Sequence, residues 1–207
     1  ENSLYKLSIE SYKYHATIMS CDNENIIKKV KDNENVERLV PFMQYGIRYS
    51  IPGSLTFADV IGVKEEDMNY FLEKESIQVM VGRLPEKDKK EIAVNYLVAK
   101  NKKITIGDSV GNALDKFDGI NGEYKVVGIL KGASMLSVVS FNNEIFKDYS
   151  DNEKSLQRGV IVFPKKNKIS EVNKLVENLP KGEAVYDTFN TLDKEFHDVE
   201  GSMRILE

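Results

Sequence analysis

The N-terminal part of the chain predicts a strand, a helix and a second strand. Residues 5–10 alternate apolar with polar side chains, which is the period of a half-buried strand. The polar run 22–25 supplies helix-capping residues ahead of the apolar positions in 26–31, so we expect a short helix there. Residues 36–43 are typical of a strand, and Pro41 within them indicates an edge or an end of that strand.

The C-terminal part repeats this order of elements. Residues 159–163 form a continuous apolar run that predicts a strand. Residues 169–179 place their apolar side chains on one helical face, and Pro180 and Gly182 end that helix. A further strand is expected at 184–186, which completes a second β-α-β unit.

Between these ends the pattern is mainly that of short strands separated by turns. Dipeptides such as Pro52-Gly53 and Asp118-Gly119 are strong turn signals. Short helices are expected at 64–72, 96–99 and 142–149. The expected strands are 47–51, 55–63, 92–94, 104–106, 124–130 and 137–141.

We therefore predict an α+β protein with two lobes. One α/β lobe is built from the two β-α-β units, and so from both chain ends, 1–72 and 153–207. Residues 73–152 form a small β-rich lobe inserted into it. A chain of 207 residues is long enough for such a pair of lobes.

The last predicted helix carries an apolar stripe. Its members are spaced four, three, four and three residues apart, which resembles a coiled-coil heptad. They are Leu192, Phe196, Val199, Met203 and Leu206. An isolated helix of this length is marginal in water, so the stripe requires a partner. Three partners are open: the chain's own core, a second copy, or a continuation of the chain into a membrane.

Composition limits the classes of function. Hydrophobic residues make up 41% and charged residues 30% of the chain, which allows a core with much wet surface. The net charge of −4 argues against nucleic-acid binding, which needs a clustered basic surface. The sequence contains no apolar run long enough for a transmembrane helix.

The sequence offers little for catalysis or for metal and cofactor binding. Cys21 is the only cysteine, so the chain predicts neither an internal disulfide nor a cysteine-based metal site. His15 and His197 are the only histidines and have no metal-ligand spacing with neighbouring acids. Asp115, Asp118 and Glu123 do not follow the spacing of a calcium loop and are expected in a solvated hairpin. We predict no catalytic residue, cofactor or metal.

The stretch from residue 82 to residue 131 contains an ordered set of short motifs. Any one of them is weak alone, but the order and spacing are specific. The motifs are Gly82-Arg83-Leu84-Pro85, Glu91-Ile92, Ile106-Gly107-Asp108-Ser109-Val110 and Tyr124-Lys125-Val126-Val127-Gly128-Ile129. Gly128 within an apolar strand indicates a bulge or a close backbone approach.

This stretch resembles the extracytoplasmic core domain of MacB/FtsX-type ABC transporter permeases. The resemblance implies a membrane-proximal α/β lobe with an inserted β-rich lobe, in a membrane protein whose domain lies outside the cytoplasm. It implies that Arg83 and Glu91 are signature positions, expected to pair and fix the inserted lobe. Gly82, Leu84, Gly107, Asp108, Val127 and Gly128 are the other signature positions, expected to be structural.

The resemblance also implies partners and a function. A cytoplasmic ABC ATPase would hydrolyse ATP, a second permease copy would form a dimer, and the domain would relay motion to an envelope protein or to an exported peptide or lipid-linked cargo. The helix 192–206 would be part of a membrane-proximal stalk. Two other interpretations stay open: a stand-alone extracellular ligand-binding or sensor module, marked by a large apolar pocket, and an enzyme, marked by a cleft with perturbed titratable groups.

Overall fold

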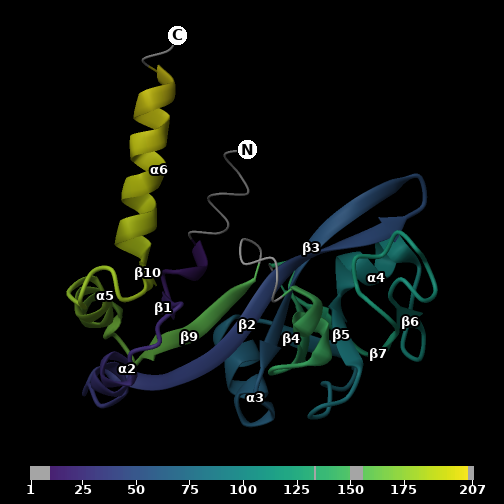
Figure 1. The fold of residues 1–207 in the computed structure, drawn as a ribbon, viewed down its shortest axis with the longest axis horizontal. Coiled ribbons are helices and arrows are strands. Elements are labelled where there is room, and N and C mark those ends of the chain that lie inside the picture. The colour runs from purple at the N-terminus through teal and green to yellow at the C-terminus, as the bar shows by residue number, and fades with distance from the viewer. Residues whose placement is uncertain (1–9, 133, 150–155, 205–207) are drawn as a thin grey trace. The chain divides into compact units, whose positions relative to one another are not determined.

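The computed structural model describes residues 10–132, 134–149 and 156–204. Its contacts divide the chain into two compact units: residues 1–40 with 159–207, and residues 41–158. Strands and helices both contribute, so the α+β class is confirmed (Figure 1). No helix in the described ranges is long and apolar enough to cross a membrane.

The first unit is a split β-α-β sheet. Strand β1 lies between β10 and β9 and runs antiparallel to both, and β2 follows on the far side of β9. With α2 between β1 and β2, and α5 between β9 and β10, this is the β-α-β-β-α-β order of ferredoxin-like folds. Its elements are β1 (Ala16–Met19), α2 (Glu24–Lys31), β2 (Val36–Ile51), β9 (Gln157–Pro164), α5 (Ile169–Glu177), β10 (Val185–Asp187) and α6 (Phe189–Arg204).

Helices α2 and α5 of this unit cover the same face of its sheet. Ile26 and Val30 of α2 and Val172 and Val176 of α5 join one apolar core with Ile18 of β1. The helix α2 begins at the capping residue expected from the sequence, since the side chain of Asn23 accepts a bond from the Asn25 N–H. The predicted strand at 5–10 lies almost entirely outside the described residues.

The second unit contains the β-rich part of the chain. Strand order continues from β2 through β3, β8, β5 and β7 to β4, and β6 pairs with β7. A second apolar core includes Tyr45, Tyr49, Val94, Tyr124 and Phe146. Its elements are β3 (Ser54–Val63), α3 (Glu65–Lys74), β4 (Gln78–Gly82), β5 (Glu91–Asn95), α4 (Tyr96–Lys102), β6 (Ser109–Val110), β7 (Tyr124–Lys131), β8 (Ser137–Ser140) and η1 (Glu144–Tyr149).

The grouping of residues 41–72 differs from the predicted division of the chain. The sequence places them with the terminal lobe, whereas they belong to the second unit. The reason is strand pairing: β3 is antiparallel to β2 from the Phe42–Val63 pair to the Ile51–Ser54 pair, and its other edge pairs with β8. Pro41 does not end β2, which continues to Ile51.

The two units are connected through strands. One boundary falls between Val40 and Pro41 inside β2, and the other between Arg158 and Gly159 inside β9. Boundaries between compact units are more often found in flexible linkers. Here neither crossing of the chain is a loop.

The strand predicted at 104–106 is absent. Lys103 ends α4 in the left-handed conformation, with φ 57°. The Thr105 N–H then binds the Asp108 carboxylate at 2.8 Å, and the Asp108 N–H binds the Thr105 carbonyl at 3.1 Å. These bonds close a turn, so the β-branched run does not enter the sheet.

Candidate functional site

The signature residues of the sequence gather around strand β7. The Arg83 N–H donates to the Val127 carbonyl at 2.9 Å. The Gly107 N–H donates to the Val126 carbonyl at 2.9 Å, and the Val126 N–H donates to the Asp108 carbonyl at 2.8 Å. Two segments distant from β7 in the sequence are thus fixed to consecutive residues of this strand.

Two glycines allow the backbones to come this close. Gly82 has φ +78°, and a Cβ on it would lie 2.2 Å from the Val127 carbonyl oxygen. A Cβ on Gly128 would lie 2.2 Å from the Arg83 carbonyl oxygen. The pairing of β5 with β7 also shifts register next to Gly128. The sequence predicts a bulge or a close approach at Gly128, and the structure has both.

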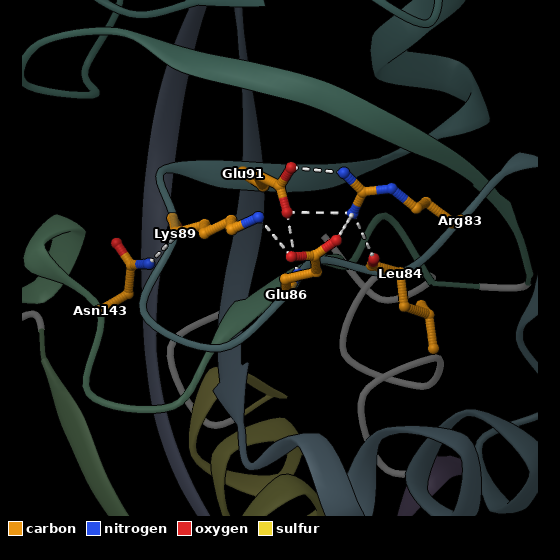
Figure 2. A network of polar contacts seen from close by, with 6 residues as sticks. All are labelled: Arg83, Leu84, Glu86, Lys89, Glu91 and Asn143. Atoms are coloured by element: carbon orange, nitrogen blue, oxygen red, sulfur yellow. Dashed lines mark hydrogen bonds and ion pairs between the residues drawn. The ribbon is translucent and has the colours of Figure 1, made fainter.

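An ion pair spans the loop between β4 and β5 (Figure 2). The guanidinium of Arg83 binds the Glu91 carboxylate with both terminal nitrogens, Nη1 to Oε1 at 3.0 Å and Nη2 to Oε2 at 2.5 Å. The Glu86 N–H donates to the same carboxylate at 2.9 Å, and Arg83 also donates to the Leu84 carbonyl at 3.1 Å. Such two-pronged pairing fixes geometry as well as charge.

The environment holds Glu91 in its ionised form. The side chain of Glu91 is only 10% exposed, whereas that of Arg83 is 48% exposed. Hydrogen bonds from Arg83 and, more weakly, from the Glu86 N–H lower the pKa of Glu91 to about 2, against the opposing effect of burial. A general acid or base needs a pKa near the working pH. Glu91 is therefore held as an ionised hydrogen-bond acceptor in this network.

A buried asparagine connects the same loop to the rest of the second unit. Asn143 Nδ2 donates to the Lys89 carbonyl at 2.8 Å and to Ser140 Oγ at 3.0 Å. The Tyr124 hydroxyl donates to Asn143 Oδ1 at 2.8 Å, so β7 is tied to the segment before η1. Lys89 also forms an ion pair with Glu86, which extends the network at the surface.

A second charged cluster holds the 111–122 segment. The carboxylate of Asp118, whose side chain is 1% exposed, accepts a bond from Lys102 Nζ at 2.8 Å. It also accepts bonds from the Ser50 N–H at 2.9 Å and the Gly111 N–H at 3.1 Å. Lys102 further donates to the Ser50 carbonyl at 2.9 Å. These bonds join α4, the end of β2 and the 111–122 segment.

The sequence did not reveal this cluster. The sequence predicts a turn at Asp118-Gly119, and the solvated hairpin expected around Asp118 is wrong for its side chain, which is buried. The partners Lys102 and Ser50 lie 16 and 68 residues away along the chain. No short-range pattern indicates contacts at such separations.

The stripe of the last helix belongs to α6, which begins with a cap. The Thr191 N–H donates to Thr188 Oγ1 at 3.2 Å, and the Thr188 N–H donates to Thr191 Oγ1 at 2.9 Å, a reciprocal arrangement like a capping box. Thr188 also donates to Glu177 of α5 at 2.9 Å. Val199 is 56% exposed, so the stripe is not enclosed by the core of the first unit at that point.

The other stripe residues say less about whether the stripe is covered. Leu192 and Phe196 are half-buried, and Leu206 lies outside the described residues. Met203 falls in α6, which ends at Arg204. Figure 1 shows α6 extending away from β10 and α5. The stalk role of these residues stays a prediction.

The structure brings together no metal site among the described residues, where no group of three or more histidine, cysteine or acidic side chains converges. Two cavities have volumes of about 320 and 340 Å³. The first is lined mainly by charged residues of α2 and its approach, beside Cys21, and the second by polar groups around Lys102 and Asp115. Neither contains a set of groups that identifies a ligand.

No protein-family model and no curated protein sequence matches the chain. Among solved structures, the periplasmic region of MacB from Actinobacillus actinomycetemcomitans is similar, with a TM-score of 0.54 and 12% identity over 89% of this chain and 92% of that one. The extracellular domain of the ABC-type transporter YknZ from Gram-positive bacteria has a TM-score of 0.51 and 16% identity over 80% of this chain and 91% of that one. The chain therefore has the fold that the signature motifs predicted.

Proposed function

We propose that this chain is the extracytoplasmic domain of a MacB/FtsX-type ABC transporter permease, and that it relays motion instead of performing chemistry. The observation that carries the proposal is the fold likeness to the periplasmic region of MacB, which extends over 89% of the chain. The similarity to the extracellular domain of YknZ supports the same assignment. In this role the domain lies outside the cytoplasm and is anchored in the cell membrane.

This role assigns different tasks to the ATPase, to the second permease copy and to this domain. A cytoplasmic ABC ATPase hydrolyses ATP, and a second permease copy completes the transporter. Movement of the transmembrane helices passes through α6 into the first unit and then to the second unit. There it acts on an envelope protein or on an exported peptide or lipid-linked cargo. The two-pronged Arg83–Glu91 pair supports a mechanical role, because it fixes the end of β4 to β5 through two charged hydrogen bonds.

The proposal is tested by removing the second unit from the full-length permease. Because β2 and β9 are neighbours in the first unit, a short turn can replace residues 41–158 between Val40 and Gly159. The shortened permease is reconstituted with its ATPase in liposomes, and ATP hydrolysis and transport are measured together. We expect hydrolysis to continue and the partner-dependent or cargo-dependent activity to be lost.

Transport at the full rate without the second unit would contradict the relay. A control replaces Lys87, an exposed loop residue, with Ala, and this variant should transport normally. The parent reading frame supplies an independent check, because the proposal requires hydrophobic spans adjoining this domain and a gene for an ABC ATPase beside it.

A further inference from the structure

Acidic residues flank the apolar stripe of α6. With the stripe spacing assigned to the core positions d and a of a heptad, Asp193 and Glu200 occupy position e and Glu195 occupies position g. These are the positions whose charges face a partner helix and set partner choice. The basic residues Lys194 and Arg204 fall at positions f and b, which face away from such a partner.

In the structure, two of the acidic side chains that flank the stripe are accessible to solvent. The Asp193 and Glu200 side chains are 45% and 31% exposed, and His197 lies between them, 3.6 Å from Asp193 and 3.9 Å from Glu200. Near the start of the helix, burial raises the pKa of Asp187, and the negative charge of Glu195 raises it further. The exposed Val199 shows that the stripe is open to solvent where these acids flank it.

Self-pairing of α6 would bring like charges together. In a parallel pair, Glu195 of one helix would face Glu200 of the other, and in an antiparallel pair the e positions would place Asp193 opposite Glu200. Like charges across a helix interface are unfavourable and select against that partner. A helix with basic residues beside its apolar seam would instead form opposite-charge contacts at every such position.

We propose that α6 docks a partner α-helix whose apolar heptad seam is flanked by lysine or arginine, and that a second copy of α6 is excluded. The inference rests on α6 alone and does not depend on the transporter assignment. A dimer of the whole protein would then be held by other surfaces.

The test measures the binding of two designed peptides to the full 207-residue chain by fluorescence anisotropy. Both peptides carry leucine at positions a and d; one has lysine and the other glutamate at positions e and g. Because each charge contact changes sign between them, we expect the lysine peptide to bind about tenfold more tightly at low salt. Added salt should reduce this preference.

Three variants separate the seam from general charge attraction. The double variant Glu195→Lys with Glu200→Lys should reverse the preference, so that the glutamate peptide binds better. Asp198→Lys makes the same kind of change at position c, off the seam, and should largely keep the original preference. Val199→Asp interrupts the seam and should abolish binding of both peptides, with circular dichroism confirming that each variant is folded.

Several results would overturn the proposal. One is equal affinity for the two peptides, or no binding of either. Another is undiminished binding of the lysine peptide to Val199→Asp, which would show nonspecific attraction. The third is dimerisation of the unmodified chain in sedimentation equilibrium that Val199→Asp prevents, since this would make the second copy the occupant.

Discussion

Three hydrogen bonds converge on the Glu91 carboxylate, two from Arg83 and one from the Glu86 N–H. A carboxylate with this many donors is stabilised in its charged form. Its protonation state therefore affects the stability of the loop between β4 and β5. The pair gives the positions Arg83 and Glu91 a physical role in the stability of this loop.

We expect Glu91→Gln to lower the free energy of unfolding at neutral pH by about 1–2 kcal/mol, less than the full linkage value because Arg83 is half exposed and its charge is screened. The pKa of Glu91 is lowered to about 2 from its usual 4.5. The stabilisation is therefore fully present above the unfolded-state pKa and is lost as the pH falls through the folded-state pKa. Urea unfolding of both proteins from pH 7 to about pH 2 measures this difference.

The difference between the two proteins should be mostly lost at the acid end of that range, where the pH reaches the folded-state pKa of Glu91. A matched control is Glu86→Gln, which changes an acid whose side chain is 49% exposed and should cost less than about 0.5 kcal/mol. A difference between Glu91→Gln and the unmodified chain that does not change with pH would contradict the role assigned to the ionised pair.

Gly128 is needed because another backbone lies against it. Gly128→Ala would place a methyl group 2.2 Å from the Arg83 carbonyl oxygen, so β7 or the loop must shift. We expect a loss of about 2–3 kcal/mol in the free energy of unfolding, measured with urea. Gly46→Ala is the control, because its nearest neighbour, Asp59, would be at an ordinary 3.6 Å. Equal stabilities of the two variants would contradict the close approach.

At the scale of elements, the ion pair of Asp118 fixes the 111–122 segment to α4. Asp118→Ala would leave the Lys102 ammonium buried beside the Ser50 carbonyl, with Asp115 at 3.7 Å as its remaining acidic partner among the described residues, and we expect it to cost about 3 kcal/mol. Adding Lys102→Met should recover part of this loss, because the uncompensated charge is removed. Urea unfolding of the single and double variants measures both effects.

Asp115→Ala is the control for this cluster. The Asp115 side chain is 37% exposed and lies farther from Lys102, so the variant should destabilise the protein much less than Asp118→Ala does. A double variant less stable than Asp118→Ala alone would show that Lys102 stabilises the fold through contacts other than this charge pair.

Helix α6 contains one position that can be improved. A Cβ on Gly201 would meet nothing within 4 Å, so Gly201→Ala should stabilise the helix by about 1 kcal/mol. Circular dichroism at 222 nm during thermal unfolding measures the gain. Gly182→Ala is a useful comparison: it also meets open space, but its φ of +86° strains any other residue, so this variant should destabilise. A loss of helix signal in Gly201→Ala would contradict the open position.

Elements whose order depends on local pattern were predictable from the sequence. The helix α2 has its cap and its apolar face within a few residues, and the run predicted as a strand at 55–63 contains its own apolar positions. The strand predicted at 104–106 is wrong because the Asp108 side chain accepts a bond from the Thr105 N–H, which competes with pairing in the sheet. The β-branched pattern of this run contains no information about such a turn. Asp118 and Asn143 were missed because their partners are distant in the chain.

At the scale of the whole molecule, the second unit has its own apolar core and its own strand order. We therefore expect residues 41–158 to fold cooperatively when expressed alone. Thermal unfolding followed by circular dichroism, together with dispersed amide signals in a nuclear magnetic resonance spectrum, tests this. A fragment ending at residue 152 and starting at residue 73 is the comparison; it lacks β2 and β3 and should not fold.

The sequence predicts that one lobe is inserted into another, because both chain ends show a β-α-β pattern. The place of the boundary was not, because the pairing of β3 with β8 joins residues 60–63 to residues 137–140. A pairing at that separation leaves no trace in the periodicity of either strand. The signature stretch identified the fold, since it reports the turns and close approaches around β7.

The strand connections between the two units have a mechanical consequence. An extended chain already spans about 3.3 Å per residue and cannot lengthen much further. Tension applied at Val40 or at Gly159 would reach the other unit at once, with no slack to be taken up first. A short glycine-serine spacer inserted at either point would have to be extended before it transmitted tension from one unit to the other.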